Sequence, residues 1–94
     1  MGLKKYTIIT ELDNETRTVV TDYRGLIFKT LIYNDSIDTN TFEMYIDNGA
    51  KMYHIDLQPN QTIELKPEIR LDIETLKVYG SLKGLHIIVE ILED

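Results

Sequence analysis

Apolar and polar residues alternate with a period of two along most of the chain. The clearest case is the segment 53–65, in which the alternation from Tyr53 to Leu57 is interrupted by Pro59-Asn60 and resumes at Ile63. Side chains of a strand point to opposite faces in turn, whereas proline and asparagine favour corners. This segment therefore predicts two strands joined by a turn. No stretch of ten or more residues shows the period of an amphipathic helix.

The same reasoning divides the whole chain into about eight short strands. The expected strands are 6–12, 17–23, 26–33, 42–46, 51–57, 63–65, 76–79 and 85–92, and 69–73 is either a further strand or an extended link. Between them we expect a turn at Asp22–Gly25, a polar loop at Asn34–Asn40 and a turn at Gly80–Gly84. Asp47-Asn48-Gly49 predicts a tight hairpin, because Asn-Gly between alternating strands favours such turns.

The alternation also predicts which side chains face the core. Phe42, Met44 and Ile46 are expected to point inward while Glu43, Tyr45 and Asp47 point outward, and the last strand carries Leu85, Ile87, Val89 and Ile91 on one face. In the first strand Tyr6, Ile8 and Leu12 are expected to share a face. The strand 26–33 is apolar on both faces, which indicates a central strand or one covered from outside.

Many short strands of even spacing are typical of an antiparallel β-sandwich with jelly-roll-like connections. The 94 residues are expected to form one domain, 1–94, with one core. A net charge of −6 without a basic stripe argues against nucleic acid or an anionic membrane as a partner. The chain has no cysteine and no run of 18 apolar residues. It is expected to be made in a reducing cytoplasm and not to span a membrane.

Few residues are candidates for chemistry. His54 and Asp56 share a strand face, but two groups do not make a metal site, and the other histidine, His86, is on another strand. Oxygens of Asp35, Asp38 and Asp47 are candidate calcium ligands without the spacing of a calcium-binding loop. Neither the serines nor the acids show a catalytic motif. We therefore predict no catalytic residue, no metal site and no cofactor.

Apolar residues on outward faces are the stronger indication of function. Such residues on neighbouring strands would make a patch suited to a protein partner, unless loops of the same domain cover them. We expect self-association through this surface, into a trimer or a larger ring. The predicted interface residues are Leu31, Tyr33, Tyr45, Tyr79, Ile88 and Leu92.

Five segments between Leu26 and Glu93 share one pattern of strands and strand ends. They are Ile32-Tyr33-Asn34-Asp35-Ser36, Phe42–Ile46, Tyr53–Leu65 with its Leu-Gln-Pro-Asn-Gln-Thr-Ile-Glu-Leu, Leu76-Lys77-Val78-Tyr79 and Ile87–Glu93. Together these segments resemble the small β-sandwich virion proteins of tailed bacteriophages. The chain departs from that family before Leu76-Lys77-Val78, where it has Ile73-Glu74-Thr75 in place of the usual Gly-Asp turn.

The resemblance implies a non-enzymatic structural subunit of a virion, in the capsid, neck, tail or fibre. Its partners would be other virion proteins and further copies of itself, after synthesis in the host cytoplasm. The alternative is a soluble module that binds a carbohydrate or another ligand, such as a receptor-binding tip. That function needs exposed aromatic side chains, for which Tyr45, Tyr53 and Tyr79 are the candidates. A hydrolytic enzyme is a remote third class.

Overall fold

The computed structural model describes residues 2–47 and 50–94 and contains seven strands, all paired antiparallel. Among these residues no helix has the length and apolar character needed to cross a membrane. The strands are β1 (Lys4–Thr10), β2 (Glu15–Asn34), β3 (Asn40–Ile46), β4 (Ala50–Leu57), β5 (Thr62–Leu65), β6 (Ile69–Gly80) and β7 (Leu85–Glu93).

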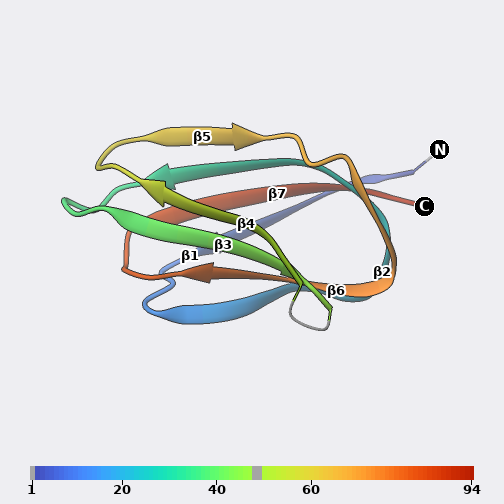
Figure 1. Cartoon of the computed structure of the whole chain (residues 1–94). Helices are drawn as coiled ribbons and strands as arrows, with labels where there is room; N and C mark the ends of the chain where they lie inside the picture. Colours follow the sequence, from blue (N-terminus) through green and yellow to red (C-terminus); the bar gives the residue numbers. More distant parts are fainter. Residues whose placement is uncertain (1, 48–49) are drawn as a thin grey trace.

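The strands form one sheet that folds back on itself into two layers (Figure 1). Their order is β1-β7-β2-β6-β3-β4. β5 lies outside this order and pairs with the C-terminal part of β2, whereas β6 pairs with the part of β2 that precedes it. One layer contains β5, the C-terminal part of β2, β7 and β1, and the other contains the N-terminal part of β2, the C-terminal part of β6, β3 and β4. Only β3 and β4 are neighbours in both sequence and sheet. The structure thus confirms the all-β, jelly-roll-like antiparallel sandwich.

The predicted turn at Asp22–Gly25 is wrong, because β2 continues through it and bends instead. Register against β6 shifts between Thr18 and Val20, between Val20 and Tyr23, and again at Arg24, and Asp22 has a φ of 46°. Extra residues on one strand of a pair bend it and increase its twist. Both halves of β2 therefore keep β6 as a partner while the strand passes from one layer to the other (Figure 1).

β6 makes the same bend, which joins the predicted segments 69–73 and 76–79 into one strand. At the bend Ile73 has a φ of 58° and its side chain is 56% exposed, although the alternation places it beside buried Leu71. A positive φ turns the next side chains away from strict alternation. The merging of segments in β2 and β6 explains why seven strands are present where about eight were predicted.

A bulge at Phe28 explains why this part of β2 is apolar on both faces. Ile27 pairs with Ile91 of β7 and Lys29 pairs with Glu90, so Phe28 is the extra residue. Strict alternation would place Ile27 and Ile32 on opposite faces of the strand. Both are buried, because the bulge between them changes which positions face inward. β2 has partners on both sides, as expected for a central strand.

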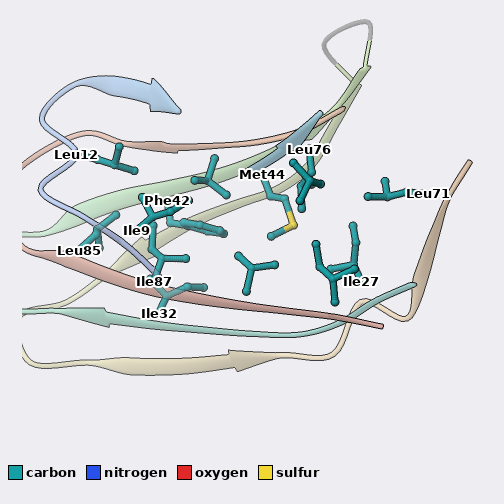
Figure 2. Close-up of a cluster of buried hydrophobic side chains, with 14 of the residues drawn as sticks. Ile9, Leu12, Ile27, Ile32, Phe42, Met44, Leu71, Leu76, Leu85 and Ile87 are labelled. Atoms are coloured by element: carbon teal, nitrogen blue, oxygen red, sulfur yellow. The ribbon is translucent and has the colours of Figure 1, made fainter. Parts of the chain in front are cut away.

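The core lies between the two layers (Figure 2). The predicted inward residues of β3 and β7 are confirmed. Phe42 and Met44 are buried and Ile46 packs against the core. In β7 the buried residues are Leu85, Ile87, Val89 and Ile91. In the first strand the expected shared face is wrong for Leu12. Leu12 is buried with Ile9, whereas Tyr6 and Ile8 point outward, since Glu11 has a φ of 62° and reverses the alternation.

Asn34 connects the end of β2 with the loop before β3 and with the end of β4. Its buried side-chain amide donates to the carbonyl oxygens of Asp38 (2.9 Å), Leu57 (3.1 Å) and Gln58 (3.2 Å), and its Oδ1 accepts from the N–H of Ser36 (3.0 Å). Its backbone also bonds to the turn between β4 and β5. Asn34 therefore holds the end of β2 to the segment that begins at Leu57.

The predicted hairpin residues Asn48 and Gly49 lie outside the described residues. The strands on either side, β3 and β4, pair antiparallel from Asn40 opposite Leu57 to Ile46 opposite Ala50.

Candidate interaction surfaces

The six predicted interface residues fall on two different surfaces of the sandwich. Leu31 and Tyr33 of β2 lie with Ile88 and Leu92 of β7 on the outer face of the β5-β2-β7-β1 layer, which we call the β7 face. Tyr45 of β3 and Tyr79 of β6 lie on the outer face of the other layer, which we call the β3 face. The structure therefore does not bring all six residues into one patch.

The β7 face has an apolar centre. Leu31, Ile88 and Ile8 are aligned across β2, β7 and β1, because Ile88 is directly opposite Leu31 on one side and Ile8 on the other. Ile88 is 38% exposed and Ile8 is 71% exposed, and Tyr6 of β1 adds a side chain that is 60% exposed. Side chains aligned on adjacent strands form one continuous surface.

A shallow hollow of about 230 Å³ lies in this apolar centre. It is lined by Tyr6, Lys29, Leu31, Ile88 and Glu90. Sequence reasoning identified Leu31 and Ile88 but missed Tyr6 and Ile8. The sequence showed that Tyr6 and Ile8 lie on the same face of the first strand, but nothing in it showed that this face points outward.

Charged residues at the rim of the hollow are paired with one another. Lys4 lies 3.5 Å from Glu90, and Lys29 lies 3.4 Å from Glu64 on β5. Glu90 is itself nearly buried. Its carboxylate meets a cation there, so the hollow presents an apolar floor and a neutralised rim.

Tyr33 lies at one end of the β7 face and is held by polar contacts. Its hydroxyl donates to Oδ1 of Asn60 at 3.0 Å, and its ring centroid is 6.0 Å from that of His86. His86 Nε2 is in turn 3.6 Å from Asp35. Tyr33 is therefore half-buried and its hydroxyl is used within the chain. Leu92 lies toward the other end of the face and is half-buried.

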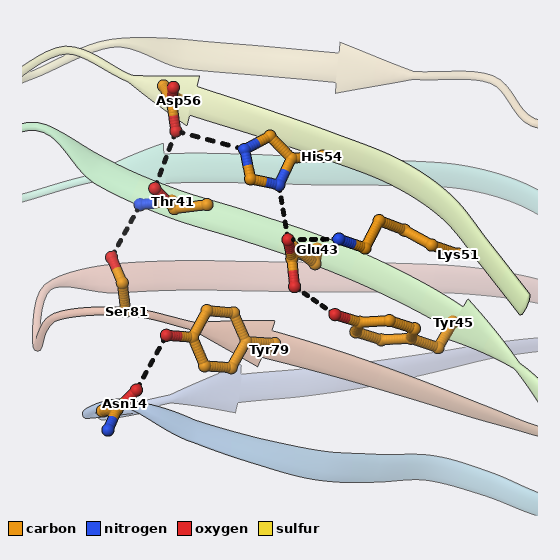
Figure 3. Close-up of polar contacts among 9 residues, drawn as sticks. All are labelled: Asn14, Thr41, Glu43, Tyr45, Lys51, His54, Asp56, Tyr79 and Ser81. Atoms are coloured by element: carbon orange, nitrogen blue, oxygen red, sulfur yellow. Dashed lines mark hydrogen bonds and ion pairs between the residues drawn. The ribbon is translucent and has the colours of Figure 1, made fainter. Parts of the chain in front are cut away.

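The centre of the β3 face is polar and is organised around Glu43 (Figure 3). Its nearly buried carboxylate accepts hydrogen bonds from the Tyr45 hydroxyl, from Lys51 Nζ at 2.9 Å and from His54 Nδ1. The Tyr45 hydrogen bond, followed by that of Lys51, lowers the pKa of Glu43 to about 2. The same contacts raise the pKa of Tyr45 and of Lys51. Hydrogen bonds to the charged form of an acid favour that form.

Both tyrosines of the β3 face are bound within the chain. Tyr45 donates to Glu43, and Lys51 Nζ lies 5.8 Å from the centre of its ring. The hydroxyl of Tyr79 donates to Oδ1 of Asn14 at 2.8 Å (Figure 3). Both side chains are half-buried. Among the described residues, the β3 face is therefore a hydrogen-bonded polar network without an exposed apolar centre like that of the β7 face.

The candidate metal ligands do not form a cluster. His54 Nε2 is 3.8 Å from Asp56, while its Nδ1 is used by Glu43. Asp35 and Asp38 are in the loop before β3, whereas Asp47 follows the far end of β3 and accepts from the N–H of Thr75 at 2.7 Å. Within residues 2–47 and 50–94, no three acidic or histidine side chains are grouped in a way that would hold a metal ion.

Comparisons with known proteins identify no family for this chain. No protein-family model matches the chain, and no curated protein matches its sequence. A chain in the structure of infectious bursal disease virus, Gx strain, is similar to this chain with a TM-score of 0.45 and 13% sequence identity over 96% of this chain. This protein spans 33% of the length of that viral chain. A likeness of that degree carries no argument about function, which has to be inferred from the two surfaces.

Proposed function

We propose that this protein is a non-enzymatic structural subunit of a tailed-phage particle that binds other virion proteins through the β7 face. The supporting observation is the continuous apolar centre of that face, formed by Tyr6, Ile8, Leu31 and Ile88 around the hollow. Exposed apolar residues that are aligned on neighbouring strands and surrounded by polar groups are typical of protein interfaces. The reason to place the protein in a phage particle is the resemblance of its sequence to virion proteins of tailed bacteriophages.

The chemistry of the face supports a protein partner. Burial of apolar area contributes about 25 cal/mol per Å², so a contact that covers a few hundred Å² contributes several kcal/mol before the cost of association. The paired rim carboxylates, Glu64 and Glu90, add no unpaired charge that a partner would have to desolvate. A complementary apolar surface of another virion protein, or of a second copy, would fit such a face.

The alternative function, a carbohydrate-binding module, has less support from the same structure. Aromatic platforms for sugars need exposed rings. Tyr45 and Tyr79 are half-buried and their hydroxyls bond within the chain, and Tyr53 packs against the core. The three tyrosines that the sequence offered for this function therefore do not form an open platform.

The proposal is tested by incorporation of variants into phage particles. Leu31→Asp places a charge in the floor of the hollow and is expected to reduce the amount of this chain in purified particles at least tenfold, while the isolated domain stays folded. Thr18→Asp, on an exposed position of β2 in the other layer, is the matched control and should be incorporated normally. Mass spectrometry of particles and of assembly intermediates measures both. Absence of the wild-type chain from all of them would reject the structural role.

A further inference from the structure

The outer edge of β1 is open in its middle, from Tyr6 to Ile9, between two lysines at its start and Arg17 at its end. β1 ends the sheet order and pairs only with β7 among the described strands. Between its two lysines and Thr10 it contains no charge, no proline and no bulge, which are the usual means of protecting an edge. The strand at the other end of the order, β4, differs because it carries Lys51, His54 and Asp56 and has a register shift against β3.

The hydrogen-bond pattern shows which backbone groups of β1 point to the free edge. The N–H of Glu93 donates to the carbonyl of Leu3, and in an antiparallel pair every second residue bonds the same neighbour. Odd-numbered residues of β1 therefore bond β7, and even-numbered ones point their N–H and C=O groups away from it. Arg17 supports this, because its guanidinium donates to the outward carbonyl of Thr10 at 3.1 Å.

We propose that this edge pairs antiparallel with β1 of a second copy, about a two-fold axis at Thr7. In this register Tyr6 opposes Ile8 of the other copy and Lys4 opposes Thr10. The outward-pointing N–H and C=O groups of these residues then find partners, and the carbonyl of Thr10 does so in addition to its hydrogen bond from Arg17. Both side chains of the Tyr6–Ile8 pair lie on the β7 face, and aromatic residues opposite β-branched ones stabilise paired strands. The two β7 faces then form one surface.

The charges at the two ends of β1 select this orientation. Lys5 is exposed at its beginning beside Lys4, which also pairs with Glu90. Glu11 and Asp13 are exposed just beyond its end. An antiparallel pair brings the basic end of one copy beside the acidic end of the other, whereas a parallel pair would place lysine beside lysine. A two-fold contact of this kind uses the same patch on both copies and closes as a dimer. The dimer rests on the β1 edge alone and does not require the proposed virion role.

The first experiment compares Ile8→Pro with Ile8→Val by sedimentation. Proline removes the outward N–H of residue 8 and is tolerated where a strand faces solvent, while valine keeps both the N–H and the branched side chain. The wild type and Ile8→Val are expected to be dimers at tens of micromolar, and Ile8→Pro is expected to dissociate at least ten times more readily with an unchanged far-ultraviolet spectrum. A wild-type monomer or trimer at that concentration overturns the proposal.

A second experiment tests the register and does not depend on the proline variant. The chain has no cysteine. Thr7→Cys would place two cysteines opposite each other at about 4.5 Å between Cα atoms, within disulfide reach. The matched control is Lys5→Cys, whose two copies lie about 13 Å apart because each is two residues from the axis on strands that rise about 3.3 Å per residue. A disulfide-linked dimer of Thr7→Cys alone is expected. Equal cross-linking of both variants, or of neither, overturns this pairing.

Discussion

Replacement of Asn34 by alanine is expected to be among the most destabilising single changes at the surface end of the sandwich. The side chain is buried and joins the end of β2 to the loop before β3 and to the end of β4. Alanine removes the side-chain amide, so three carbonyl oxygens lose a hydrogen-bond donor and the N–H of Ser36 loses its acceptor. The change alters no apolar contact of the core, so the effect isolates the hydrogen bonds.

The loss of stability in Asn34→Ala depends on which hydrogen-bond partners of Asn34 water can reach in the variant. Asp38 and Gln58 are exposed, and water can replace the amide at their carbonyl oxygens. Leu57 is fully buried, so its carbonyl oxygen stays unsatisfied, whereas the N–H of Ser36 is partly buried and is satisfied only in part. An unsatisfied buried group costs about 1–3 kcal/mol. The two groups together give a loss of about 3 kcal/mol in the free energy of unfolding.

Urea unfolding followed by far-ultraviolet circular dichroism measures this loss. With a slope of about 1.5 kcal/mol per molar urea, the midpoint should fall by about 2 M while the slope stays the same. Thr39→Ala is the matched control in the same loop, because Thr39 is exposed and makes one side-chain contact, to Gln58 at 3.4 Å. It should change stability by less than about 0.5 kcal/mol. An Asn34→Ala variant as stable as this control would refute the reasoning.

Three further predictions concern the β3 face, the two sides of β7 and the bend in β6. Because the folded-state pKa of Glu43 is lowered to about 2, its charge stabilises the fold above the unfolded-state pKa, and that stability, about 3 kcal/mol, is lost as the pH falls from about 5 toward 2. Glu43→Gln should remove most of this pH dependence in urea titrations. Ile87→Asp should prevent folding because it buries an unpaired charge, whereas Ile88→Asp should leave a cooperative thermal transition, and equal effects would contradict the assigned faces. Ile73→Asn should raise stability by about 0.5–1 kcal/mol, since asparagine tolerates a φ of 58° better than a β-branched residue, and a fall in melting temperature would contradict this.

The amino-acid sequence by itself determined the strand content and the inner faces of regular strands. The alternation of Phe42 and Met44 with polar residues, and of Ile87 and Val89 in the last strand, correctly predicted which side chains are buried. This succeeds because the period of two is a local property of an extended chain and because one face of these strands is polar enough to identify the other. The polar loop after Asn34 was also predictable from its composition.

The tertiary structure alone decided where strands bend and which face of an ambiguous strand is buried. The turn predicted at Asp22–Gly25 is a bend because β6 pairs with both halves of β2, and no local pattern shows that partner. The bulge at Phe28 changes the inward parity in mid-strand, which a strict period of two misses. The outward placement of Tyr6 and Ile8 likewise depends on how β1 pairs with β7.

The two surfaces were only partly predictable for the same reason. Leu31 and Ile88 were identified as outward apolar residues, and the structure aligns them with Ile8 because β7, which is distant in sequence, lies between β1 and β2. Glu43 was correctly placed on an outward face, yet its carboxylate is nearly buried, because Tyr45 and neighbours on β4 cover it. Sequence alternation tells which side of a strand a residue occupies. What covers that side is set by strand order, which depends on contacts between distant segments.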